Sequence, residues 1–207
     1  MNAYSFAHLR STSPRVGRPR KVVIHTSGGI RPPEGLYDTL RSRVGPRTPD
    51  GLSAHYLVGA DGRTIQAAPD SLVCLHAGKA NPDSIGIECV CPLFPGVAWR
   101  VEREKHGVHR NRYRDRVRGR RTVDLLDLTE AQYEALVLLV ESLCDRHGIP
   151  RRVPVDRDGT LLRREMTLAE LRDFEGVLGH FQVPTAPTVK LDPGTAPLER
   201  LRVRWAR

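Results

Sequence analysis

Residues 21–29 read KVVIHTSGG, an apolar run that includes one histidine and ends at two glycines. Side chains alternate along an extended chain, so Val23, His25 and Ser27 would share one face of a buried strand. A buried imidazole needs a polar partner, because its desolvation otherwise costs free energy. The stretch therefore predicts a central strand whose histidine meets polar groups from elsewhere in the chain.

Two further stretches have the pattern of strands. SAHYLVGADGRTIQAAP, at 53–69, contains two alternating runs around the Asp-Gly pair at 61–62, which supplies the positive φ of a hairpin turn. DSIGIECVC, at 83–91, is a strong strand in which Gly86 and Glu88 share a face. The hairpin would bring antiparallel neighbours into the sheet.

Three segments are predicted as helices: 34–44, 130–147 and about 168–175. The second and the third begin with a capping box, formed by Thr129 with Gln132 and by Thr167 with Glu170. Helices therefore interleave with strands along the chain. We expect an α/β fold with a mixed central β-sheet that is flanked by helices.

The length of 207 residues and the 39% hydrophobic content suit a single folded domain. We place this domain at 21–207 and expect residues 1–20 to be a flexible, basic lead-in. The N-terminus lacks the apolar run of a secretory signal peptide, and no stretch approaches the ~20 apolar residues that span a bilayer. These features predict a cytoplasmic chain without a membrane span, and they leave open non-classical export or release by lysis.

Much of the net charge of +9 is concentrated in one segment. Residues 103–121 contain nine Lys or Arg and two acidic residues, a local charge of +7. We interpret the region near 95–123 as an inserted surface loop or ribbon. A solvated loop is the simplest interpretation, attraction to anionic cell-wall polymers is the alternative, and nucleic-acid binding is disfavoured.

The cysteines are too few for a disulfide scaffold: Cys74, Cys89, Cys91 and Cys144. Cys74-x-His76 together with Cys89-x-Cys91 would be an alternative zinc site, but this is not the usual spacing of a zinc knuckle. We therefore favour buried, reduced thiols.

The eight histidines fall into two groups. Four lie in basic stretches or at a helix end, where a solvated or helix-capping role is favoured: His8, His106, His109 and His147. Four lie in or beside strand-like segments: His25, His55, His76 and His180. For any one of these, a hydrogen-bonded core histidine is the simpler interpretation. Together with Glu88 and the Lys190-x-Asp192 pair, the second group forms a candidate site.

This candidate site has the residue types of a catalytic zinc centre, which needs about three protein ligands and one open position. In an extended segment Lys190 and Asp192 point the same way. Asp192 could then ligate a metal while Lys190 stabilises negative charge on a substrate oxygen. Spacing alone leaves open which of the other residues complete the ligand set.

The chain resembles the zinc-dependent N-acetylmuramoyl-L-alanine amidases of the type 2 family, which includes the peptidoglycan recognition proteins. The matching pieces follow the family order and cover most of residues 22–194, except 95–123 and roughly 151–166. They are VVIHTS, LSAHYLVGADGRTIQAAPD, CLHAGKANPDSIGIECV, LTEAQYEALVLLVESLCDRHGIP and VLGHFQV with VKLDPG. The resemblance implies an amidase fold shared with the recognition proteins.

The resemblance also implies an activity, hydrolysis of the amide between N-acetylmuramic acid and L-alanine in peptidoglycan or muropeptides. It implies roles for eight residues: His25, His180 and Asp192 as Zn²⁺ ligands, Glu88 as the acid–base residue, Lys190 as the group that polarises the scissile carbonyl, and His55, His76 and Asn81 as substrate-binding residues. The alternative function is a non-catalytic module that binds peptidoglycan. Recycling enzyme, phage lysin and delivered toxin all remain open as settings.

Overall fold

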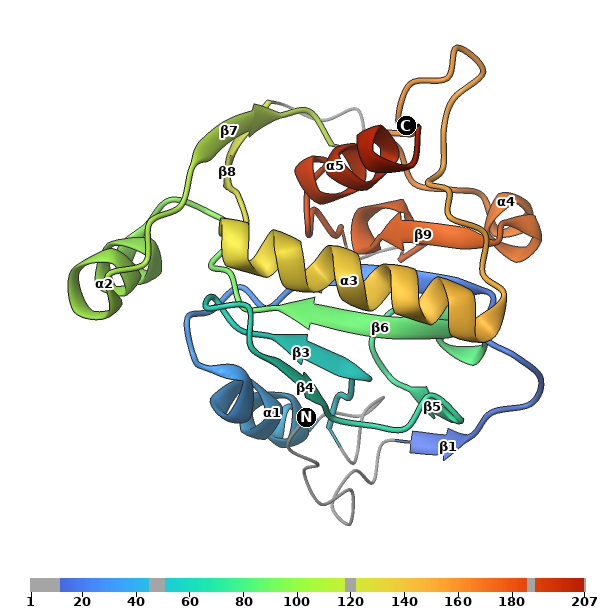
Figure 1. Cartoon of the computed structure of the whole chain (residues 1–207), viewed down its shortest axis with the longest axis horizontal. Coiled ribbons are helices and arrows are strands. Elements are labelled where there is room, and N and C mark those ends of the chain that lie inside the picture. Colours follow the sequence, from blue (N-terminus) through green and yellow to red (C-terminus); the bar gives the residue numbers. More distant parts are fainter. Residues whose placement is uncertain (1–11, 45–50, 118–121, 186–188, 207) are drawn as a thin grey trace.

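The computed structural model describes residues 12–44, 51–117, 122–185 and 189–206. Its centre is a five-stranded sheet in the order β4-β3-β6-β2-β9 (Figure 1). The strands are β2 (Lys21–Thr26), β3 (Tyr56–Val58), β4 (Thr64–Gln66), β6 (Ser84–Cys89) and β9 (Gly176–Gly179). β4 runs antiparallel to β3, whereas the other neighbouring pairs are parallel. The predicted mixed sheet and the hairpin are therefore confirmed.

The central strand β2 is buried along its whole length. Val22 and Ile24 belong to one apolar cluster, and Val23 belongs to a second cluster on the opposite face of the sheet. His25 follows Ile24 and so shares the face of Val23. Because β2 lies between β6 and β9, its histidine is surrounded by the carboxyl ends of parallel strands.

Helices cover both faces of the sheet. On one face, α3 (Glu130–His147) and α5 (Ala196–Trp205) contribute Leu136, Val140, Leu198 and Leu201 to the cluster that holds Ile24 (Figure 1). On the other face, the cluster around Val23 includes residues of α4 (Leu168–Asp173) and of the 3₁₀ helix η2 (Gly78–Asp83). A third cluster joins α1 (Pro33–Ser42) to the sheet through Leu57 of β3.

The predicted helices are all present, with small differences at their ends. α3 has the predicted bounds, and both capping boxes form as expected. α1 begins and ends slightly before the predicted 34–44 segment, and α4 ends at Asp173. Within the described residues, no helix combines the length and the apolar character that crossing a bilayer requires.

The expected flexible lead-in is structured over residues 12–20. β1 (Thr12–Pro14) pairs antiparallel with β5 (Leu72–Cys74). Arg15 is the next residue after β1, and its guanidinium donates hydrogen bonds to the carbonyl oxygens of Leu72 at 2.7 Å and Ser84 at 2.8 Å. The expectation is thus wrong for this part, because a basic residue here binds backbone carbonyls instead of solvent. The first part of the lead-in, residues 1–11, lies outside the described residues.

The Arg-rich segment is also integrated into the fold. It forms α2 (Val97–His106) and β7 (Arg112–Asp115), and β7 pairs antiparallel with β8 (Val123–Leu126). Between α2 and β7, the buried Arg110 binds both carboxylate oxygens of the buried Glu102 at 2.8 Å and the Gln132 side chain at 2.7 Å. The antiparallel pair β7 and β8 is the ribbon that was one of the two predicted forms, and the burial of Arg110 inside the domain was not predicted. Residues 118–121 lie outside the described part.

Candidate metal centre

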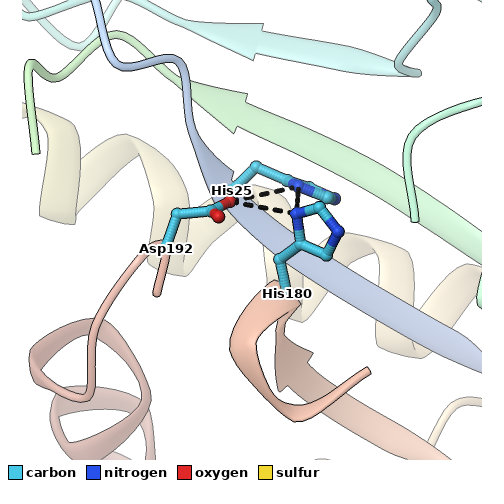
Figure 2. Close-up of side chains that lie close together, drawn as sticks. All are labelled: His25, His180 and Asp192. Carbon is cyan, nitrogen blue, oxygen red and sulfur yellow. Dashed lines mark hydrogen bonds and ion pairs between the residues drawn. The ribbon is translucent and has the colours of Figure 1, made fainter. Parts of the chain in front are cut away.

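The carboxyl ends of β2 and β9 bring two histidines together. These strands are parallel neighbours with Ile24 opposite Gly179, so His25 and His180 are the next residues along each chain. The 3₁₀ turn η3 (His180–Gln182) redirects the second chain at once. The two Nδ1 atoms lie 2.9 Å apart (Figure 2).

Asp192 completes the group from the loop before α5. Its Oδ2 lies 3.2 Å from Nδ1 of His180 and 3.4 Å from Nδ1 of His25 (Figure 2). The backbone of this loop is tied to η3, because the amide of Phe181 donates to the carbonyl oxygen of Asp192 at 2.9 Å. Among the described residues, these three form the group whose ligand atoms could hold one metal ion.

The donor set fits zinc. Tetrahedral zinc with ligand bonds of about 2.0–2.1 Å places neighbouring ligand atoms about 3.3 Å apart, close to the three separations found here. Two imidazole nitrogens and one carboxylate are common zinc donors. Both histidines are buried, and an imidazole must be neutral to ligate. Burial, together with the positive charges of His180 and Lys190, lowers the pKa of His25 to about 4.

The Asp192 carboxylate is held in its charged form. Burial opposes ionisation, but hydrogen bonds with His180 and His25 outweigh it and keep the pKa of Asp192 well below its usual range. The group thus offers a metal one negative charge and two neutral nitrogens. A divalent cation bound there would retain a net positive charge for its substrate.

Glu88 and Lys190 are the predicted catalytic residues beside this group. Glu88 of β6 is the register partner of His25, and its Oε1 lies 3.9 Å from His25 Nδ1. Burial, then the nearby charge of Asp192, raises the pKa of Glu88 to about 8. The half-buried Lys190 acts in the opposite direction on this carboxyl group. The structure therefore brings both residues to the candidate centre.

His76 supports the centre from the second layer of contacts. Its Nδ1 lies 3.0 Å from Nε2 of His25, on the side of that ring away from Asp192, and its Nε2 lies 3.3 Å from the Ser84 hydroxyl. The ring packs on the backbone of β6 at Gly86, where an added Cβ would lie only 2.6 Å from the imidazole. Such contacts orient a ligating histidine.

His55 lies inside the fold. It is fully buried, and its Nδ1 accepts a hydrogen bond from the Gly86 amide at 2.9 Å. Its Nε2 lies 3.0 Å from the Leu72 carbonyl oxygen and 3.1 Å from the Arg15 guanidinium. Both ring nitrogens are thus hydrogen-bonded inside the fold, and the predicted contact of His55 with substrate stays a prediction. Burial lowers the pKa of His55 to about 4.

Asn81 shapes the site through the backbone. Its side-chain oxygen accepts hydrogen bonds from the amides of His76 at 3.1 Å and Ala77 at 2.6 Å. The asparagine therefore holds the loop that carries His76. Its predicted contact with substrate stays a prediction.

Sequence patterns did not reveal Arg15 or Arg43. Arg15 contacts His55 from within an apparently unstructured basic stretch, and the positive charge of Arg43 acts on Glu88. Neither residue lies in a motif, and only the folded chain places them near the site.

The cysteines do not form a second metal site. All four are buried and free. Burial raises the pKa of Cys74 to about 12 and that of Cys91 to about 11. The thiols are therefore protonated at neutral pH in the metal-free protein. The interpretation as buried, reduced thiols agrees with this arrangement.

Comparison with known proteins agrees with this geometry. The sequence profile of the family N-acetylmuramoyl-L-alanine amidase (Amidase_2) matches residues 15–195. The chain belongs to this family. It is thus an amidase of peptidoglycan, as the resemblance implied. No curated protein matches the amidase in sequence.

Solved structures share the fold of the amidase. The N-acetylmuramoyl-L-alanine amidase LysC from Clostridium intestinale URNW has a TM-score of 0.54 and 14% identity, over 92% of this chain and 87% of that chain. The E. coli amidase AmiD, solved with anhydro-N-acetylmuramic acid-L-Ala-D-gamma-Glu-L-Lys, has a TM-score of 0.53 and 20% identity, over 93% and 60%. Drosophila peptidoglycan recognition protein SD has a TM-score of 0.50 and 15% identity, over 91% and 82%.

Proposed function

We propose that the protein is a zinc-dependent amidase that cleaves the bond between the lactyl carbonyl of N-acetylmuramic acid and L-alanine. The proposal is carried by the convergence of His25, His180 and Asp192, whose ligand atoms lie 2.9–3.4 Å from one another. It is supported by the position of Glu88 beside this group. His25, His180 and Asp192 would hold the zinc ion.

When bound, zinc supplies a Lewis acid that acidifies water and polarises a carbonyl oxygen. Glu88 accepts the proton of the attacking water and delivers it to the leaving nitrogen of L-alanine. Burial and the charge of Asp192 raise the pKa of Glu88, which favours uptake of a proton by this carboxyl group.

The remaining residues position charge and donors. Lys190 offers a positive charge to the carbonyl oxygen as negative charge develops there. His76 fixes the ring of His25 through its contact with Nε2. In this proposal Glu88 transfers the proton of amide hydrolysis, and Lys190 stabilises the negative charge that develops on the carbonyl oxygen.

The direct test is digestion of intact sacculi and of soluble muropeptides, followed by mass spectrometry. Release of free stem peptides with an unmodified N-terminal L-alanine is expected, and treatment with a chelator should abolish it. Recovery on adding zinc back would identify the metal. Binding of sacculi without any release of peptide would instead favour the alternative, a non-catalytic recognition module.

The exposed face of the Arg-rich segment suggests a partner. Its basic side chains project from α2 and β7 and are accompanied by few acids: Arg103, Lys105, Arg112, Arg114 and Arg116. Asp124 pairs with two of these arginines, which leaves a net positive surface. We infer that this surface attracts anionic wall polymers and so keeps the enzyme near its substrate.

A further inference from the structure

The strand β7 has two different faces. Along β7 and the two residues that follow it, Arg112, Arg114 and Arg116 are exposed, whereas Tyr113 is half-buried and Asp115 and Val117 are buried. This alternation follows from the twofold period of a strand. The inner face of β7 therefore packs on the domain, and the segment it contacts is the loop that carries Asp192.

Tyr113 and Asp115 contact the residues directly after Asp192. The Tyr113 hydroxyl lies 3.4 Å from the carbonyl oxygen of Pro193. Asp115 Oδ2 accepts hydrogen bonds from the amide of Thr195 at 2.8 Å and from its hydroxyl at 2.9 Å. Three successive positions after the metal ligand are thus in contact with the strand, once Gly194 is included.

Gly194 shows how close this contact is. Its φ is +80°, and a Cβ added there would lie 2.1 Å from the Tyr113 hydroxyl and 2.7 Å from Leu125 Cδ1. A side chain at this position would displace the loop or the strand. The glycine of the LDPG motif therefore permits β7 to press against the turn.

The Asp115 carboxylate is a rigid anchor. Its side chain is 1% exposed, and its other oxygen, Oδ1, lies 2.9 Å from the Arg163 guanidinium. A buried carboxylate that loses its partners is destabilising. The Asp115 carboxylate, the amide and hydroxyl of Thr195 and the Arg163 guanidinium therefore favour a single arrangement. Asp192 is then fixed on two sides, by η3 through the Phe181 amide and by β7.

We propose that Tyr113 and Asp115 are positioning residues that hold Asp192 against His25 and His180 and so set the affinity of the site for zinc. The inference rests on the proposed zinc function. It also gives a role to part of the 95–123 segment, which lies outside the stretches that match the family pattern. Contacts one layer behind a ligand commonly change metal affinity about 10–100-fold.

The test measures zinc affinity by competition with a chelator of known strength, in the intact chain. Asp115→Ala should raise the zinc Kd about 10–100-fold, and Tyr113→Phe should raise it severalfold. Arg114→Ser is the matched control, because it changes the outer face of the same strand, and its Kd should equal that of wild type. Activity of Asp115→Ala should be recovered by excess zinc, which a general loss of structure would not allow.

Circular dichroism of the zinc-free variants separates positioning from unfolding. If Asp115→Ala does not fold, Thr195→Val removes the hydroxyl arm of the same contact and should also weaken zinc binding. Wild-type affinity in every folded variant would overturn the inference while leaving the proposed function intact. A wild-type protein that binds no zinc would overturn both.

Discussion

His25 and Glu88 face each other across parallel strands β2 and β6, in register and with Nδ1 3.9 Å from Oε1. The proposed metal ligand and the proposed proton acceptor thereby lie on neighbouring strands. Their separation is set by strand pairing, which resists displacement more than a loop does. The two groups can therefore be perturbed independently.

Replacing Glu88 by glutamine should abolish turnover without removing the metal. Glu88→Gln keeps the shape of the side chain but cannot accept a proton, so kcat should fall about 10²–10⁴-fold. The zinc content, measured by atomic emission after gel filtration, should stay close to that of wild type. Glu104→Gln, on the exposed side of α2, is the matched control. Near-wild-type turnover of Glu88→Gln would refute its assigned role.

Replacing His180 by alanine should remove both metal and activity. The substitution deletes one of the three proposed ligands, and His25 and Asp192 alone should not hold the cation. Added zinc should raise the melting temperature of wild type, because a ligand that binds only the folded state stabilises it. His180→Ala should lose this shift. A zinc-dependent shift of unchanged size would show that the metal binds elsewhere.

The stability of the zinc-free protein should fall as the pH is lowered from about 6.5 to about 4. Burial lowers the pKa of His55 in the folded state to about 4, against about 6.5 when unfolded. In this window the unfolded chain binds more protons, so stability rises with pH. The contribution of His55 alone amounts to at most about 3.4 kcal/mol. Urea unfolding in the presence of a chelator, at several pH values, measures it.

The variant His55→Gln isolates this contribution. It removes the titrating ring, so its stability should depend less on pH between 4 and 6.5 than that of wild type. It should also be less stable at pH 7.5, because the Gly86 amide loses its acceptor. An unchanged pH dependence would assign the effect to other groups.

Truncating Arg110 should destabilise the domain. Arg110→Ala leaves the Glu102 carboxylate buried without its partner, which typically costs about 3–5 kcal/mol. Arg103→Ala, an exposed residue of the same segment, should change the free energy of unfolding by less than about 0.5 kcal/mol. Chemical denaturation compares the two. Equal and small changes in the free energy of unfolding would show that Arg110 does not stabilise the domain.

Neutralising the outer basic face should weaken attachment to anionic walls only. The combined variant Arg103→Ser, Lys105→Ser, Arg114→Ser and Arg116→Ser should be released from wall preparations at lower salt than wild type, since exposed charges are screened by salt. Hydrolysis of soluble muropeptides should be unchanged. Walls stripped of anionic polymer serve as the control, and equal retention of both proteins on intact walls would contradict the proposal.

Periodicity in the sequence predicted the sheet well. The alternation in KVVIHTS and SIGIECVC gave β2 and β6 and the faces of His25 and Glu88. Periodicity could not predict that β2 and β6 pair with each other, because register depends on contacts between segments that are distant in the chain. The ligand set came from the family resemblance, and spacing alone had left it open.

The contacts of buried and half-buried polar residues were the main features that the sequence did not predict. Arg15 and Arg110 lie in stretches that look solvated, but distant carbonyl groups bind the half-buried Arg15 and a carboxylate binds the buried Arg110. The resemblance implied a substrate-binding role for His55, and the sequence did not predict that a backbone amide and an arginine bind its ring. Such placements depend on long-range partners, which local patterns do not contain.

The alternating character of β7 has a consequence for mutational scanning. Positions 112, 114 and 116 should tolerate nearly any replacement without loss of zinc binding, whereas replacements at positions 113, 115 and 117 should weaken it, and glycine should be required at 194. A saturation library screened for zinc binding would therefore show tolerant and intolerant positions in alternation along residues 112–117.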